Sequence, residues 1–196
     1  MNCVAQALLP VPKYPSWKSQ AQKPCRITLV SDFFFMMKDF YRRSLPHIQS
    51  YNAVYFVTFK TRRDLFLSRA ARTIALRHVL FENGKRIELH AAVVMPNHVH
   101  LLFTALEDDC GEPYSLAEIM KGIKGSSAYR INRLLERRGH LWRDESFDRV
   151  LRSREFENKF NYICANPVDA GLCIRPKEYR WLWTQPAQAR VPVPHK

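Results

Sequence analysis

Hydrophobic residues recur at two different spacings along this chain. Around residue 100 they fall on alternate positions, where Val99, Leu101 and Phe103 alternate with His98, His100 and Leu102. Side chains alternate between the two faces of a strand, so this pattern predicts a β-strand with one apolar face. The opposite face of the same strand then carries both histidines.

Later in the chain the spacing is that of a helix. Phe156, Phe160 and Ile163 follow the i, i+4, i+7 pattern of a buried helical stripe. Pro167 disfavours helical backbone at the residue before it. We therefore expect this helix to end near Asn166.

The same two spacings assign elements to the rest of the chain. Strands are predicted at 53–60, 86–95, 98–105 and 146–152, and helices at 68–82, 115–137 and 154–166. Only Pro96 and Asn97 separate the two central strands, a short link that suits an antiparallel hairpin. The element order predicts a ferredoxin-like α+β sandwich, an antiparallel sheet with helices packed on one face.

One domain accounts for most of the length. Residues 1–40 contain several prolines and no clear period, which predicts a disordered arm or an over-extended gene start, with Met36 or Met37 as the true start. We assign 41–184 to a single domain and expect 185–196 to be a loose tail.

The charge of the chain indicates a polyanionic partner. The chain has 31 Lys and Arg against 18 Asp and Glu, a formal net charge of +13. Such an excess favours nucleic acid through counterion release, although a run of charge can also be a solvated helix face. The excess is strongest between 121 and 154, where ten basic residues stand against four acidic ones. From this region we expect DNA-backbone contacts by Lys121, Lys124, Arg130, Arg137, Arg149 and Arg152.

Composition also bears on the compartment. The five cysteines show no CxxC spacing, no secretory signal is evident, and no apolar run approaches the length of a membrane span. These features predict reduced thiols in a cytoplasmic protein with no membrane partner.

Two pairs of polar residues are candidates for chemistry. His98 and His100 share a strand face and can bind one metal ion, but two imidazoles need a further oxygen or nitrogen ligand. Tyr162 and Asn166 are four residues apart and therefore neighbours on a helix, where they can supply a nucleophile and a ligating oxygen. The alternative is two solvated histidines, a half-buried tyrosine and a helix-terminating asparagine.

Taken together, the motifs resemble a known family. The strings are MPNHVHLLF at 95–103, ESFDRV at 145–150 and YICANPVDAGL at 162–172, with Trp142 before the second. In this order they resemble the single-tyrosine HUH transposases, and among them the REP-associated tyrosine transposases of bacteria. The resemblance extends from about Arg42 to about Trp183.

The resemblance implies a role for each candidate. His98 and His100 match the metal ligands of the HUH fold, Asn166 the polar residue that completes the metal shell, and Tyr162 the nucleophile. The metal is expected to be Mg²⁺ or Mn²⁺, with Zn²⁺ as an alternative. The implied reaction cleaves and rejoins single-stranded, hairpin-forming REP-like DNA through a 5′-phosphotyrosine. A nucleoid-associated monomer is expected, and a dimer is possible.

Three alternatives stay open. The protein can be a domesticated enzyme that cleaves REP hairpins without moving an element, or a non-catalytic hairpin-binding module. An RNA-binding or structural protein is supported by the basic charge alone.

Overall fold

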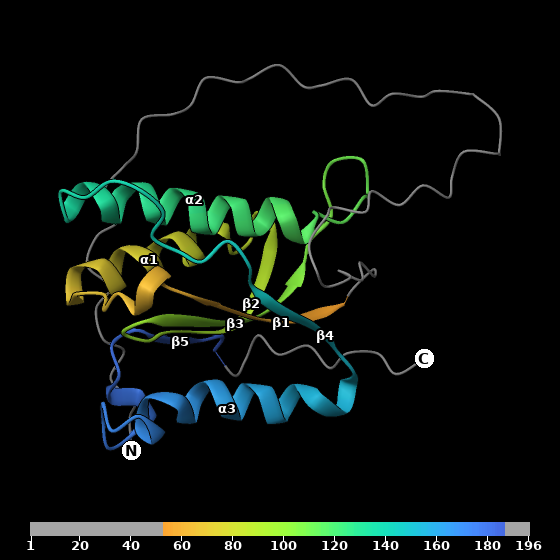
Figure 1. Ribbon diagram of the computed structural model, residues 1–196. Helices are drawn as coiled ribbons and strands as arrows, with labels where there is room; N and C mark the ends of the chain where they lie inside the picture. Colours follow the sequence, from red (N-terminus) through yellow and green to blue (C-terminus); the bar gives the residue numbers. More distant parts are fainter. Residues whose placement is uncertain (1–52, 187–196) are drawn as a thin grey trace. The chain divides into compact units, whose positions relative to one another are not determined.

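The computed structural model describes residues 53–186, which are built on a five-stranded antiparallel sheet (Figure 1). The strand order is β4-β1-β3-β2-β5, with all neighbours antiparallel. The strands are β1 (Val54–Lys60), β2 (Ile87–Val94), β3 (His98–Ala105), β4 (Phe147–Leu151) and β5 (Leu182–Thr184). The first four lie in the order expected of a ferredoxin-like sandwich, and the α+β class is confirmed.

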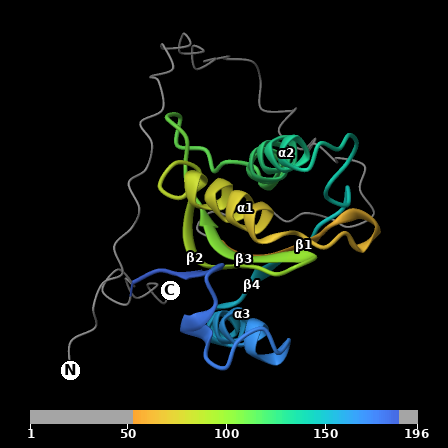
Figure 2. The ribbon, with the colours of Figure 1, turned by 90° about the vertical axis from the view of Figure 1, so that its left-hand side faces the viewer.

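Helices lie on both faces of this sheet. They are α1 (Arg69–Glu82), α2 (Leu116–Leu134) and α3 (Phe156–Asp169), with short 3-10 helices η1 (Arg62–Asp64), η2 (Ser153–Glu155) and η3 (Pro176–Glu178). Figures 1 and 2 show α1 and α2 together over one face and α3 alone over the other. The expected placement on one face therefore holds for α1 and α2 and does not extend to α3, which packs against β2 and β3 from the other side.

The main core lies between the sheet and the pair α1 and α2. Val99, Leu101 and Phe103 of β3 are fully buried, as the alternating pattern predicts. From α2, Ile119 and Ile123 are buried as well. Burial of this face fixes the register of β3, since a slip by one residue would turn these side chains to the other face.

Helix α2 is shorter than predicted. It begins at a capping box, in which Ser115 and Glu118 bond to each other's backbone N–H, and it ends at Leu134 instead of residue 137. Glu136 has a left-handed φ of 48°, which a helix cannot continue through. Leu134 and Leu135, at this end of the helix, are exposed.

Helix α3 is longer than predicted. The expected end near Asn166 was wrong, because the helix continues through Pro167 to Asp169. A proline inside a helix removes one backbone hydrogen bond but does not have to end the helix. The end comes at Gly171, whose φ is 67°, where the Leu172 N–H donates to the Pro167 carbonyl at 2.9 Å.

The segment after α3 returns to the sheet. Trp181 is buried, its indole N–H donates to Thr73 Oγ1 at 3.0 Å, and the Arg72 guanidinium lies 3.7 Å from its ring centre. The segment also forms β5, which the sequence did not predict because a three-residue strand shows no period.

Two expectations about composition can be compared with the described residues. Cys164 and Cys173 carry free thiols. Between residues 53 and 186, no helix combines the length and the apolar character that a membrane crossing requires. The predicted arm at 1–40 lies outside the described residues, as does nearly all of the predicted tail.

Candidate active site

Strand pairing sets the two histidines side by side. In the β1–β3 register His98 lies opposite Lys60 and His100 opposite Thr58. The two imidazole centres are 4.8 Å apart. The turn before them is held because Thr61 donates to the Asn97 carbonyl from its backbone N–H at 2.8 Å and from its hydroxyl at 3.0 Å. The sheet therefore fixes both imidazoles on the face that α3 covers.

Each histidine has a partner for its Nδ1 atom. His98 Nδ1 lies 2.7 Å from Asn97 Oδ1, and His100 Nδ1 lies 2.7 Å from Thr58 Oγ1. An amide oxygen only accepts, so His98 donates from Nδ1, and a neutral ring then keeps its lone pair on Nε2. With Thr58 as acceptor, His100 has the same tautomer. Such partners orient metal-binding imidazoles, and sequence reasoning assigned no role to Thr58 or Asn97.

Helix α3 brings the other two candidates to this place. The Tyr162 ring centre is 5.2 Å from that of His100, and Asn166 Nδ2 is 3.4 Å from His100 Nε2. Tyr162 is 44% exposed, so a substrate can reach this side chain. The structure thus places all four predicted residues in one site, although some 60 residues of chain separate the two pairs.

The environment keeps both imidazoles neutral. Burial is the main cause that lowers the pKa of His100 to about 3, and the charges of His98, Lys159 and Lys60 act in the same direction. The pKa of His98 is lowered by burial and by Lys60, and a hydrogen bond that the imidazole donates to Asn166 opposes this shift. Neutral imidazole is the form that binds metal.

The donor set fits a divalent ion only in part. Within residues 53–186 no group of three or more His, Cys, Asp or Glu side chains is placed to hold a metal. Asp148 does not fill this gap, because its partner on β1 is Val57, on the face that α1 and α2 cover. An ion held by the two Nε2 atoms would take further ligands from the Asn166 amide oxygen, water or a substrate oxygen.

Two lysines that sequence reasoning missed adjoin the imidazoles. Lys60 is the register partner of His98. Lys159 lies one helical turn before Tyr162, with its Nζ 4.8 Å from the Phe56 ring centre and 5.5 Å from the Tyr162 ring centre. The i, i+3 spacing on α3 was a signal for Lys159. Lys60 could be found only from the strand register.

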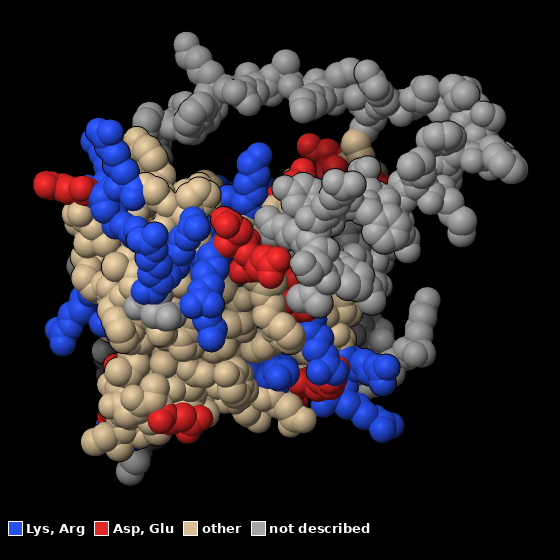
Figure 3. Space-filling view, viewed as in Figure 1, with Lys and Arg blue, Asp and Glu red and all other residues tan. Residues whose placement is uncertain are grey.

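The predicted DNA-binding residues divide between the two faces. Lys121, Lys124 and Arg130 belong to α2, and Arg137 follows it, so this group is across the sheet from His98 and His100. Figure 3 shows basic side chains gathered over α2. Lys124 has a structural contact there, since its ammonium donates to the carbonyls of residues 143 and 144 at 2.8 and 2.9 Å.

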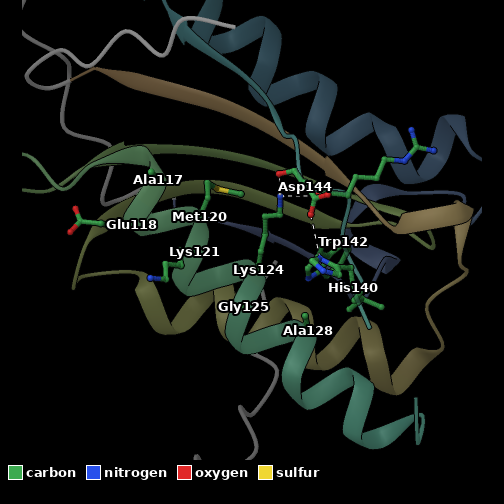
Figure 4. A pocket seen from close by; sticks show the side chains of 12 residues that line it. Ala117, Glu118, Met120, Lys121, Lys124, Gly125, Ala128, His140, Trp142 and Asp144 are labelled. Carbon is green, nitrogen blue, oxygen red and sulfur yellow. Dashed lines mark hydrogen bonds and ion pairs between the residues drawn. The ribbon is translucent and has the colours of Figure 1, made fainter. Parts of the chain in front are cut away.

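A hollow of about 460 Å³ lies beside this lysine, between α2 and the segment 140–144 (Figure 4). Trp142 forms part of its wall but is only 4% exposed, and its ring meets that of Phe59 edge-on at 4.8 Å. Trp142 is therefore a core residue. The hollow is lined by residues of α2 and of the segment 140–144, and none of the four site residues takes part in its lining.

The other two predicted DNA contacts are at the β4 edge. Arg149 lies opposite Phe56, which places it on the histidine face, where it forms an ion pair with Glu155. Arg152 follows the strand and is exposed. Phe147 lies opposite Thr58, also on the histidine face, and is 54% exposed. An exposed aromatic ring there is available for stacking on an unpaired base.

Comparison with known proteins adds a family and a fold. The sequence pattern of the family described as "Transposase IS200 like" matches residues 48–166, more than half of the chain. No curated protein matches. A solved REP-associated tyrosine transposase, bound to a REP hairpin, matches with a TM-score of 0.58 and 18% identity over 71% of this chain and 81% of that one. A candidate transposase of Deinococcus radiodurans R1 matches with a TM-score of 0.41 and 24% identity, over 62% of this chain and 95% of that one.

Proposed function

This chain belongs to the IS200-like transposase family, whose members are DNA-cleaving enzymes, and from that membership we propose that it cleaves and rejoins single-stranded REP-like hairpin DNA through Tyr162. The observation that carries the proposal is the position of an exposed tyrosine ring 5.2 Å from a buried, neutral His100. Asn166 on the next turn of α3 completes the group.

The proposed step is a transesterification. The Tyr162 oxygen attacks the scissile phosphorus and forms a P–O bond, while the bond from phosphorus to the 3′ oxygen breaks. The phenolic proton passes to solvent, and the leaving 3′ oxygen takes up a proton from solvent. The products are a 5′-phosphotyrosine and a free 3′-hydroxyl. Attack by a second 3′-hydroxyl reverses the step and joins the strands without a nucleotide cofactor.

The residues around Tyr162 have separate tasks in this reaction. His98 and His100 present Nε2 atoms, oriented by Asn97 and Thr58, that would hold a divalent ion together with Asn166. Bound Mg²⁺ or Mn²⁺ supplies Lewis-acid polarisation of a phosphate oxygen. Tyr162 is half-exposed on α3, which makes its side chain accessible to a phosphodiester.

Hairpin DNA is proposed as the substrate on two grounds. The formal charge of +13 favours a polyanion. The solved neighbour described as bound to a REP hairpin shares the fold of this chain. Since His98, His100, Tyr162 and Asn166 all come from one chain, we further propose that a monomer can carry out cleavage.

The test uses a 5′-labelled single-stranded REP-like hairpin and a 3′-labelled copy, incubated with protein and Mn²⁺ or Mg²⁺ and separated on a denaturing gel. Wild-type protein should form an adduct that carries the 3′ label, because the tyrosine retains the 5′-phosphate of the downstream strand. Tyr162→Phe and the double change His98→Ala with His100→Ala should each abolish it.

Tyr129→Phe is the matched control, because Tyr129 is an exposed tyrosine of α2 on the far side of the sheet. Tight hairpin binding by the wild type without any adduct would replace the proposal with a non-catalytic binding module. An adduct that survives in Tyr162→Phe would assign the chemistry to another residue.

A further inference from the structure

The proposed metal ligands carry no negative charge. Two neutral imidazoles and one carboxamide make up the set that the structure brings together. Mg²⁺ and Mn²⁺ prefer oxygen ligands, and carboxylates above all. In the described part of the chain, no acidic side chain joins the two histidines in a metal-binding group. The protein alone therefore offers a weak site for such an ion.

Two positive charges weaken it further. Lys60 is the cross-strand partner of His98, and directly opposed residues have Cβ atoms about 4.5–5.5 Å apart. Lys159 reaches toward the same place from α3, where its ammonium lies within 5.5 Å of the ring centres of Phe56 and Tyr162. Both rings in turn adjoin His100. A dication at the imidazole nitrogens would be repelled by ammonium groups on two sides.

A bound phosphodiester reverses each of these conditions. Its negative charge compensates the two ammonium groups, and its non-bridging oxygen is a hard ligand for the ion. The lysines that oppose the ion in the free protein would then hold the group that the ion needs. Aromatic contacts on Lys159 keep its ammonium near the site in either state.

We propose that Lys60 and Lys159 make metal binding at His98 and His100 conditional on the phosphate of bound DNA. This inference rests on the proposed function and adds an order to it, in which the ion binds tightly only in the DNA complex. Coupling between two ligands is reciprocal, so the metal must raise the affinity for the cleavage-site strand by the same factor.

Replacing either lysine should change the Mn²⁺ affinity in opposite directions in the free protein and in the DNA complex. Lys60→Met or Lys159→Met removes a repulsion in the free protein, so Mn²⁺ should bind more tightly there. The same change removes a phosphate contact in the complex, so Mn²⁺ should bind less tightly in the presence of DNA. A lysine that merely supports the fold would weaken Mn²⁺ binding in both states.

The experiment measures bound Mn²⁺ without any turnover. Free Mn²⁺ is counted by its electron paramagnetic resonance signal in the Tyr162→Phe background, with and without an uncleaved hairpin that carries the flanking single strand. Ions bound by the hairpin alone are subtracted, and the change His98→Ala with His100→Ala identifies the ions held at the site. Lys177→Met, at an exposed lysine of η3, is the matched control.

DNA should tighten Mn²⁺ binding within the usual coupling range of about 5- to 150-fold. Either lysine change should reduce this factor, because it raises the Mn²⁺ affinity of the free protein and lowers that of the DNA complex. Lys177→Met should leave the factor unchanged. Equal Mn²⁺ affinity with and without hairpin would overturn the inference, as would a lysine change that weakens binding in both states. If the hairpin binds and wild-type protein forms the Tyr162 adduct while the coupling is absent, this inference fails and the proposed function stands. If wild-type protein forms no adduct, the proposed function itself is overturned.

Discussion

At the scale of single residues, the sequence could predict which side chains meet but not what orients them. The spacing of His98 and His100 was sufficient to place both on one strand face. The partner of His100 Nδ1 is Thr58, 42 residues away along the chain. Only the register of β1 against β3 makes that contact, and no local pattern encodes it.

The contact between Thr58 and His100 leads to a prediction about metal affinity. Thr58→Val keeps the shape of the side chain but removes the acceptor for His100 Nδ1. Loss of such a partner lowers metal affinity by about 10- to 100-fold. Titration of the hairpin complex with Mn²⁺ measures the change. Thr104→Val is the control, because Thr104 makes the equivalent bond to His90 at 2.8 Å. Equal losses in both variants would deny Thr58 this role.

His100 also makes stability depend on pH. Its pKa is about 3 in the folded protein against the usual 6.5, so the unfolded chain binds the proton more tightly. The stabilisation is fully present above pH 6.5 and is lost as the pH falls toward 3. Each pH unit in that window corresponds to about 1.4 kcal/mol.

Urea unfolding in metal-free buffer measures this dependence. Between pH 6.5 and 5 the free energy of unfolding should fall by roughly 2 kcal/mol more in wild type than in His100→Gln. Parallel pH curves for wild type and His100→Gln would show that His100 titrates normally in the folded state.

At the scale of elements, the periods predicted every long helix and strand, but they missed the short strand β5, the sheet face that α3 covers and the ends of two helices. Pro167 was predicted to end α3, yet the helix continues to Asp169, and the chain leaves it at Gly171, which has a left-handed φ. Glu136 adopts a left-handed φ, which could not be predicted from its being a glutamate. Such ends depend on backbone hydrogen bonds that form only in the folded chain.

Helix α2 permits a paired test of packing against α1. A methyl group at Gly125 would meet nothing within 4 Å, whereas at Gly122 it would come within 3.0 Å of Arg86 Nη1 and Glu82 Oε1. Replacing a helical glycine with alanine stabilises by roughly 0.5–1 kcal/mol where space allows. Gly125→Ala should show this gain in chemical denaturation. Gly122→Ala should show less or a loss, because Glu82 is buried. Equal gains would mean that the α1–α2 contact is loose.

At the scale of the whole molecule, the sheet separates two groups of basic residues that lie in one continuous stretch of the sequence. Lys121 and Arg130 belong to α2, while Arg149 lies on the histidine face at β4. A run of charge in a sequence does not show which face of a sheet will carry it. The two groups can therefore contribute to DNA binding in different ways.

The salt dependence of hairpin affinity can distinguish the two groups of basic residues. Each phosphate contact contributes about 0.9 to the slope of log affinity against log salt on duplex DNA, and about 0.7 on single strands. If the α2 group holds the hairpin stem, Lys121→Ala with Arg130→Ala should lower this slope by up to about 2 and leave the rate of adduct formation at saturating DNA unchanged. Arg149→Ala with Arg152→Ala, beside the site, should reduce that rate as well. An unchanged slope in the α2 variant would assign those residues to a solvated face.

The central claim is that Tyr162 carries the DNA, and peptide mapping of the adduct tests it most directly. After nuclease and trypsin treatment, the peptide from Phe160 to Lys177 contains Tyr162 as its only tyrosine. The account predicts the mass of a 5′-linked nucleotide on that peptide, with fragmentation that places it on Tyr162. A nucleotide on a peptide with a different tyrosine would contradict the account. Cleavage of the hairpin without a nucleotide on any tyrosine of the protein would contradict it as well.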